Sequence, residues 1–131
     1  MSGATRGGVS VAKLAEDVPA IEAAPGVVIR HLVGQAVMVR LAELDAGACV
    51  TIGEPQQEHM VVVHTGAVRI DQGERSWGVG VDEAAMIRPG GDVTLTAVGE
   101  GPARCQLASS PPDIALVRHL LHLEHADHGF D

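Results

Sequence analysis

Residues 47–66, GACVTIGEPQQEHMVVVHTG, contain the pattern that decides the fold. This stretch reads as the end of one strand, a polar turn and a second strand with the apolar run MVVV at residues 60–63. The second strand stops at the turn formed by Thr65 and Gly66. A short apolar run between turn residues is typical of a half-buried strand. The stretch therefore predicts a strand–turn–strand unit within a β-sheet.

The segments on both sides of this stretch also have the features of short strands. Gly, Pro and Asp separate them at intervals of roughly 8–12 residues, which is typical of a β-sandwich or barrel. In the first long segment, Val37, Val39 and Leu41 share one face. The chain is therefore predicted to be all-β. The strands predicted outside the first stretch cover residues 27–31, 35–44, 67–70, 75–81, 84–88, 93–98 and 103–107.

The length and composition limit the number of domains and the classes of molecule that the protein can bind. The 131 residues correspond to one domain, and a hydrophobic content of 46% with only 2% aromatic residues predicts an aliphatic core. The formal net charge of −8 and the presence of one lysine, Lys13, disfavour binding to nucleic acid or to an anionic membrane surface. The first residues lack the apolar stretch of a signal peptide, and no apolar run is long enough to span a membrane. We therefore expect a cytoplasmic protein.

The two cysteines, Cys49 and Cys105, lie far apart in the sequence and fit no CxxC pattern. Buried thiols in a reducing compartment are the expected state of both residues. A disulfide between them is the alternative.

The stretch from Gly47 to Gly66 resembles the first motif of the cupin superfamily, G(X)5HXH(X)3-4E(X)6G. Both glycines stand at glycine positions of that motif. Where cupins have two His and one Glu that bind a divalent metal, this sequence has Gly53, Pro55 and His59. The resemblance therefore implies a cupin scaffold that has lost the usual metal ligands.

A separate stretch resembles the second cupin motif, G(X)5PXG(X)2H(X)3N. The fit starts at Glu83, matches the Pro and Gly framework at residues 89–91, and places Thr94 where the family has its fourth ligand, a His. Over residues 27–110 the resemblance implies a cupin-type jelly-roll barrel or sandwich. It also implies a homodimer, because small cupins generally pair their sheets and an exposed sheet edge needs covering.

Three regions of the chain are predicted. Residues 1–10 are a Gly- and Ser-rich flexible N-terminus, residues 11–110 form the barrel, and residues 111–131 include an amphipathic C-terminal helix. The apolar face of this helix must cover the barrel or a partner subunit.

A histidine at every third position of the C-terminal helix predicts a solvated face, with metal binding as the alternative. These histidines are His119, His122, His125 and His128.

His59 is the predicted catalytic residue. Alternation along its strand places it on one face with Val61 and Val63, and the cupin resemblance directs that face into the barrel. An imidazole in an aliphatic cavity can transfer a proton near neutral pH. The alternative is a hydrogen-bonded core histidine with no chemical task. The residues predicted to bind a substrate are Gln56, Gln57, Glu58, Val61, Val63, Thr94 and Arg88, whose guanidinium could hold a carboxylate or phosphate.

The sequence leaves three functions open. The first is metal-independent acid/base chemistry on a small organic molecule, of isomerase, cyclase, dehydratase or decarboxylase type as in secondary metabolism, with His59 as acid or base. The second is a sensor or carrier that binds a small molecule without converting it. The third is a metal-dependent cupin with a displaced site that uses His31 or His64. One His at the motif positions holds no catalytic ion on its own, so no metal and no cofactor are expected.

Overall fold

The computed structural model describes residues 4–6, 8–53, 56–113, 115 and 118. Within them the ordered elements are almost all strands, which confirms the predicted all-β class. A four-residue helix, α1, covers Leu14–Asp17. The strands are β1 Ala4–Arg6, β2 Val9–Val11, β3 Ala20–Ala24, β4 Val27–Val33, β5 Met38–Leu44, β6 Cys49–Ile52, β7 Glu58–Thr65, β8 Ala67–Gln72, β9 Arg75–Val79, β10 Ala84–Ile87, β11 Val93–Val98 and β12 Ala103–Ser110.

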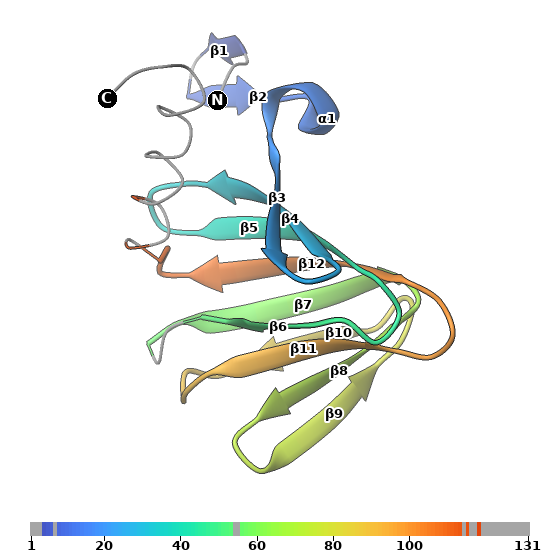
Figure 1. The fold of residues 1–131 in the computed structure, drawn as a ribbon. Helices are drawn as coiled ribbons and strands as arrows, with labels where there is room; N and C mark the ends of the chain where they lie inside the picture. The colour runs from blue at the N-terminus through green and yellow to red at the C-terminus, as the bar shows by residue number, and fades with distance from the viewer. Residues whose placement is uncertain (1–3, 7, 54–55, 114, 116–117, 119–131) are drawn as a thin grey trace.

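Two antiparallel sheets form the body of the molecule (Figure 1). The larger sheet has the strand order β10-β7-β12-β5-β4-β3, and the smaller one has the order β6-β11-β8-β9. From β5 to β12 every connection crosses from one sheet to the other except the β8–β9 hairpin. This connectivity is that of a jelly roll. Figure 1 shows the β8–β9 hairpin at the end of the molecule opposite to β1, β2 and α1.

The core lies between the two sheets and is aliphatic, as the composition predicts. Its side chains come from alternate positions of the strands, because successive residues of a strand point to opposite faces. In β11, for example, Val93, Leu95 and Ala97 are buried, whereas the intervening residues are partly exposed. His59, Val61 and Val63 share the inner face of β7, which confirms the predicted alternation.

Strand β5 has an inner face that the sequence pattern did not identify. Val39 and Leu41 do share a face, but it is the outer one. The buried positions of β5 are Met38, Arg40, Ala42 and Leu44. The β4–β5 hairpin fixes this orientation through the pairing of Val33 with Met38 and His31 with Arg40. An arginine therefore lies inside an otherwise aliphatic sandwich.

The two ends of the chain differ in part from the sequence expectations. The larger sheet begins at β3, earlier than the predicted strand at 27–31, and a β1–β2 hairpin lies within the region predicted to be a flexible N-terminus. Of the predicted C-terminal helix, only Ala115 and Arg118 are described, and both are helical and exposed. The remainder of that helix and its four histidines lie outside the described residues. In the part of the chain that is described, no helix is long and apolar enough to cross a membrane.

The two cysteines are in different environments. Both thiols are free, so the alternative of a disulfide is not realised. Cys105 is buried, and burial raises the pKa of its thiol to about 11. Cys49 is exposed at the start of β6, so the prediction that it is buried is wrong. It precedes Val50, which takes the inward position of that strand.

Gly47 and Gly66 both have a left-handed backbone, with φ of +79° and +76°. They differ in their surroundings. A Cβ atom at Gly47 would meet no atom within 4 Å, whereas one at Gly66 would lie 2.5 Å from the carbonyl oxygen of Pro102 and 2.9 Å from Cα of Ala103. Of these two glycines, Gly66 alone combines a left-handed backbone with close contact to another segment.

We expect Gly66→Ala to destabilise the protein more than Gly47→Ala. Both substitutions strain a left-handed backbone, at a cost of about 1–2 kcal/mol. Only the first also forces two backbone segments apart, which adds roughly 1–3 kcal/mol. Urea unfolding of the two variants measures the difference. Equal losses of stability would show that the contact between Gly66 and Pro102 does not constrain the fold.

Candidate functional site

His59 lies on the inner face of β7 and is 1% exposed. Its Nδ1 atom forms a hydrogen bond with the hydroxyl of Ser109, at 2.7 Å. Ser109 is the residue that pairs with His59 across the β7–β12 ladder, so the contact follows directly from the register. Val61 and Val63 continue the same face but are packed in the hydrophobic core, with exposures of 0% and 1%. Their role in contacting a substrate stays a prediction.

Arg40 brings a positive charge to the same inner face. Its side chain is 3% exposed, and its Nη2 atom donates to the sulfur of Met38 at 3.3 Å. Met38 pairs with Ser109 across β12, and His31 of β4 pairs with Arg40. The register therefore gathers His31, Arg40, Ser109 and His59 on four adjacent strands at one end of the larger sheet. We refer to these four residues as the Arg40 cluster.

Gln57 joins the cluster from the start of β7. It is one of the residues predicted to bind a substrate, and it is buried, with 2% exposure. Its Nε2 atom donates to the carbonyl oxygen of Pro111 at 2.7 Å. Nearby, the backbone N–H of Asp113 donates to the sulfur of Met38 at 3.4 Å. These bonds hold the segment after β12 against the Arg40 cluster.

A cavity of about 360 Å³ opens beside this cluster. Its polar lining residues are Glu22, His31, Arg40, Thr51 and Asp113, and Ile29 and Gly53 are among the others. His59 is not among the lining residues; it lies behind Gly53. A Cβ atom built on Gly53 would be 2.5 Å from Nε2 of His59. The imidazole thus occupies the space that a side chain at residue 53 would need.

Burial and the charge of Arg40 set the protonation states in the cluster. Burial, and to a smaller extent the positive charge of Arg40, lower the pKa of His59 to about 4. The same two causes lower the pKa of His31 to about 4. Burial also lowers the pKa of Arg40, and the carboxylate of Asp113 partly offsets that effect. At neutral pH both imidazoles are therefore uncharged beside a guanidinium.

Three buried nitrogen atoms of this cluster have no hydrogen-bond partner within the described residues. They are Nδ1 of His31, Nε of Arg40 and Nε2 of His59. No other buried side-chain nitrogen or oxygen in the described part of the chain lacks a partner. Unpaired buried polar groups are rare in native proteins and mark places where a ligand or water supplies the missing bond. The Arg40 cluster is therefore the candidate functional site.

Four residues predicted to bind a substrate lie elsewhere. Gln56 and Glu58 are exposed. Arg88 is exposed and follows Ile87, which takes the inward position at the end of β10. The prediction that Thr94 faces the cavity is wrong, because Val93 and Leu95 take the inner face of β11. The hydroxyl of Thr94 instead contacts the hydroxyl of Thr51 on the outer face, at 3.0 Å.

No family model and no curated protein matches the sequence, but solved structures match the fold. An RmlC-like cupin from Shewanella frigidimarina superposes with a TM-score of 0.64 at 13% identity, covering 76% of this chain and 89% of that one. The cupin domain of an XRE family transcriptional regulator from Enterobacter cloacae gives 0.59 at 14%, covering 67% and 99%. A sugar phosphate isomerase of the cupin superfamily from Silicibacter pomeroyi gives 0.56 at 17%, covering 67% and 61%.

The protein has the cupin fold. This result confirms the resemblance seen in the two motifs. At the end of the second motif the inward position of β11 is Val93, which is fully buried, and its neighbour Thr94 faces outward.

The residues at the cupin metal positions do not fit a divalent ion. By sequence they are Gly53, Pro55, His59 and Thr94, which offer one nitrogen donor. No group of three or more His, Cys, Asp or Glu residues that could hold a metal is found among the described residues. The guanidinium of Arg40 also lies close enough to His59 and His31 to lower the pKa of both, and it would repel a cation. The displaced His site considered from the sequence is therefore not formed by these residues.

The sequence reading missed most of the cluster around His59. His31 was considered only as a metal ligand, and Arg40, Ser109 and Asp113 were not considered. A usable signal was present for Arg40, which alternates with Met38 and Ala42 and so belongs to an apolar face. Ser109 and Asp113 gave no comparable signal, because their positions depend on the register of β12 and on the chain segment that follows it.

The free energy of unfolding should depend on pH through His59. The pKa of this residue is about 4 in the folded protein and about 6.5 in the unfolded chain, so the unfolded chain binds more protons between these values. Stability is then fully present above about pH 6.5 and falls by roughly 1–3 kcal/mol as pH decreases to about 4. Urea unfolding across this range should show a shallower dependence for His59→Gln. The matched control is His64→Gln, at an exposed histidine of the same strand. An unchanged dependence in His59→Gln would contradict the assignment.

The steric conflict between residues 53 and 59 can be measured with a double-mutant cycle. In the wild type, Gly53→Ala should cost more than the roughly 1–2 kcal/mol expected for its left-handed backbone alone, because the new methyl group overlaps the imidazole. In a His59→Ala background only the backbone cost should remain. Urea unfolding of the four proteins gives the coupling energy. A coupling energy near zero would show that the imidazole does not fill this space.

Proposed function

We propose that this cupin-fold protein binds a small organic anion beside Arg40 and moves a proton on it with His59, without a metal ion. The observation that carries the proposal is the set of three unpaired, buried nitrogens in the Arg40 cluster. Each unsatisfied buried group costs roughly 1–3 kcal/mol, and a ligand with acceptor oxygens would remove part of that cost. A carboxylate suits a guanidinium because its two oxygens match the fork of N–H donors.

The geometry of His59 supports a role as a proton acceptor. The imidazole is neutral at pH 7, and Ser109 holds its Nδ1 atom. When Nδ1–H donates to the Ser109 oxygen, Nε2 carries the lone pair and faces Gly53, which lines the cavity. Because Gly53 has no side chain, Nε2 of His59 can lie close to a residue that lines the cavity.

An isomerisation by proton transfer satisfies these constraints. Nε2 of His59 takes a proton from the hydroxyl-bearing carbon next to the ligand's carboxylate and returns it to the adjacent carbonyl carbon. The hydroxyl proton moves to the carbonyl oxygen, so the hydroxyl and carbonyl groups exchange places and no atom is gained or lost. Arg40 stabilises the negative charge that develops on the carboxylate oxygens as the C–H bond breaks. Binding of the anion also offsets the charge of Arg40 and so raises the pKa of His59, which makes it a stronger base. One structural neighbour is named as a sugar phosphate isomerase, an activity of the proposed type on the same fold.

A second candidate is binding without conversion. It is favoured by the burial of His59, which is 1% exposed and lies outside the lining of the cavity. The neighbour from Enterobacter cloacae is a cupin domain of a transcriptional regulator, which fits a sensor function on this fold. The homodimer and the cytoplasmic location stay predictions from the sequence.

Solvent deuterium exchange tests the proposal and separates the two candidates. The protein is incubated in D2O with a panel of small hydroxy- and keto-carboxylates, while thermal shifts report binding and NMR reports deuterium at the carbon next to the carboxylate. We expect at least one compound to raise the melting temperature and to exchange. His59→Gln should keep the thermal shift and lose the exchange, and His64→Gln should keep both. Exchange that persists in His59→Gln would overturn the role of His59, and a thermal shift without exchange in the wild type would establish the binding function instead.

Arg40→Met provides the matching test of the anion site. Replacing a buried charge by an apolar side chain of similar volume is often neutral or stabilising, so this variant should unfold at an equal or higher urea concentration. The thermal shift with every carboxylate should nevertheless disappear. Retained binding in a folded Arg40→Met protein would show that the anion site is elsewhere.

A further inference from the structure

A second cleft lies away from the Arg40 cluster. It has a volume of about 750 Å³ and runs between β9 and β10. Each of these is an edge strand of its sheet. No residue lines both this cleft and the cavity beside Arg40. The two strands are not hydrogen-bonded to each other, since β9 pairs only with β8 and β10 only with β7 among the described elements. The sheets are therefore open along this edge.

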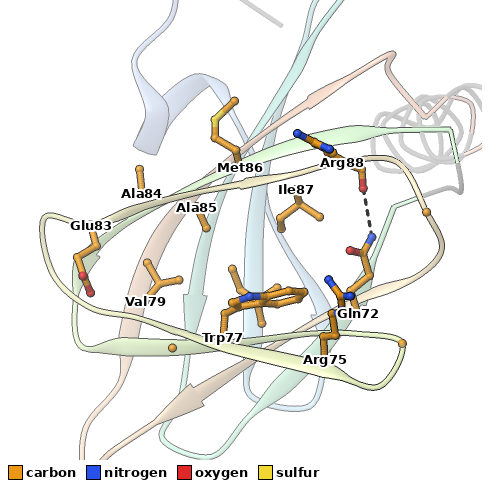
Figure 2. Close-up of a pocket in the computed structure, with 14 residues that line it drawn as sticks. Gln72, Arg75, Trp77, Val79, Glu83, Ala84, Ala85, Met86, Ile87 and Arg88 are labelled. Carbon is orange, nitrogen blue, oxygen red and sulfur yellow. Dashed lines mark hydrogen bonds between the residues drawn. The ribbon is translucent and has the colours of Figure 1, made fainter.

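Trp77 faces the space between the sheets but remains exposed to solvent at this open edge. It pairs with Ile70, which is 1% exposed, and shares its face of β9 with Val79, which is 5% exposed. Trp77 itself is 44% exposed, because β10 is only four residues long and offers it little opposing surface. Figure 2 shows the indole lying across the cleft, with Ile87 above it and Val79 to one side. A large apolar ring system and an apolar floor thus face open space.

The polar groups of the cleft are arranged unevenly around Trp77. Arg75 and Gln72 lie at one end, and Glu83 lies at the other (Figure 2). The carboxylate of Glu83 accepts a hydrogen bond from the backbone N–H of Gly80, at 2.7 Å. Gln72 donates to the carbonyl oxygen of Arg88, at 3.2 Å. Arg75, which shares the inner face with Trp77, forms no ion pair or side-chain hydrogen bond within the described residues.

We propose that this cleft is a second ligand site, for a molecule with a flat apolar ring and a carboxylate. Aromatic rings stack on one another with an energy beyond that of the buried area alone, and Trp77 offers the flat surface for such a contact. The guanidinium of Arg75 lies at the end where a carboxylate on that ring would point, and it binds the two oxygens together. A volume of about 750 Å³ is in the range of small-molecule sites.

The charge pattern favours this occupant over a neutral or cationic one. The chain carries a net charge of −8 from 17 acidic and 9 basic residues. Arg75 nevertheless places a cation at one end of the cleft, and the carboxylate of Glu83 lies at the opposite end, where it accepts a hydrogen bond from the backbone N–H of Gly80. Figure 2 shows the side chains of Met86 and Arg88 pointing away from the cleft, so Arg75 is the cation that faces the ligand.

Trp77 also makes the site directly measurable. The sequence has one Trp and no Tyr, so the intrinsic fluorescence of the full chain reports on this cleft alone. The probe is a butyl-substituted benzoate, and the corresponding benzamide is its neutral counterpart. We expect a saturable blue shift of the emission and reduced quenching by acrylamide with the benzoate, and binding at least about tenfold weaker with the benzamide.

Three variants complete the test. Arg75→Gln should weaken benzoate binding about tenfold and leave benzamide binding unchanged. The control is Arg104→Gln, which removes the same charge from an exposed ion pair with Glu43 on the outer face of β12 and should bind like the wild type. Arg40→Met should also keep the Trp77 response to benzoate. A result at this cleft therefore stands even if the proposed anion site beside Arg40 proves wrong.

Each contrary outcome overturns the proposal. The absence of a saturable change in Trp77 emission would show that the cleft takes no such ligand. Equal binding of benzoate and benzamide, or of the wild type and Arg75→Gln, would exclude the carboxylate contact. Emission that shifts with protein concentration in the absence of ligand, together with a change in sedimentation, would show that a second copy of the chain covers Trp77 instead.

Discussion

The buried guanidinium of Arg40 is the constraint on which the interior of this protein depends. A charge in an aliphatic sandwich is costly unless its partners are close, and here they are a thioether, two histidines and the nearby carboxylate of Asp113. Burial is the larger cause of the lowered pKa of His31 and of His59, and the positive charge of Arg40 is the smaller cause. Together with burial, it keeps His31 and His59 neutral at physiological pH, so that both present a free nitrogen to the same region.

The second constraint is steric and explains why the cupin metal positions have changed together. In this chain the imidazole of His59 extends to the place where a side chain at residue 53 would begin, so the observed position of His59 requires a glycine at residue 53. A histidine at residue 53 is therefore incompatible with that position. The apolar Val93 is fully buried on β11 and pairs with Ile52, the residue before Gly53. The interior thus has the chemistry of an anion site beside a neutral base, and not that of a cation site.

The sequence predicts the fold well because the fold depends on local signals. Turn residues between short apolar runs, and glycines such as Gly66 that accept a left-handed backbone, identify the strands and their order. The strand alternation around His59 could be read in the same way, since it depends on one strand only. The inward positions of β11 begin at Val93 and not at Thr94, and a difference of one residue reverses the face of every side chain in a strand. The partners of His59 could not be read, because Ser109 and Arg40 reach it through pairings between strands far apart in the sequence.

Arg40 and burial together hold the imidazole of His59 neutral near the cavity. Site-resolved NMR titration of the histidine side chains, in the wild type and in Arg40→Met, separates these two effects. We predict that His59 titrates near pH 4 in the wild type and at a higher pH in Arg40→Met, still below 6.5 because the burial remains. Titration of His59 near pH 6.5 in the wild type, or at the same pH in both proteins, would contradict it.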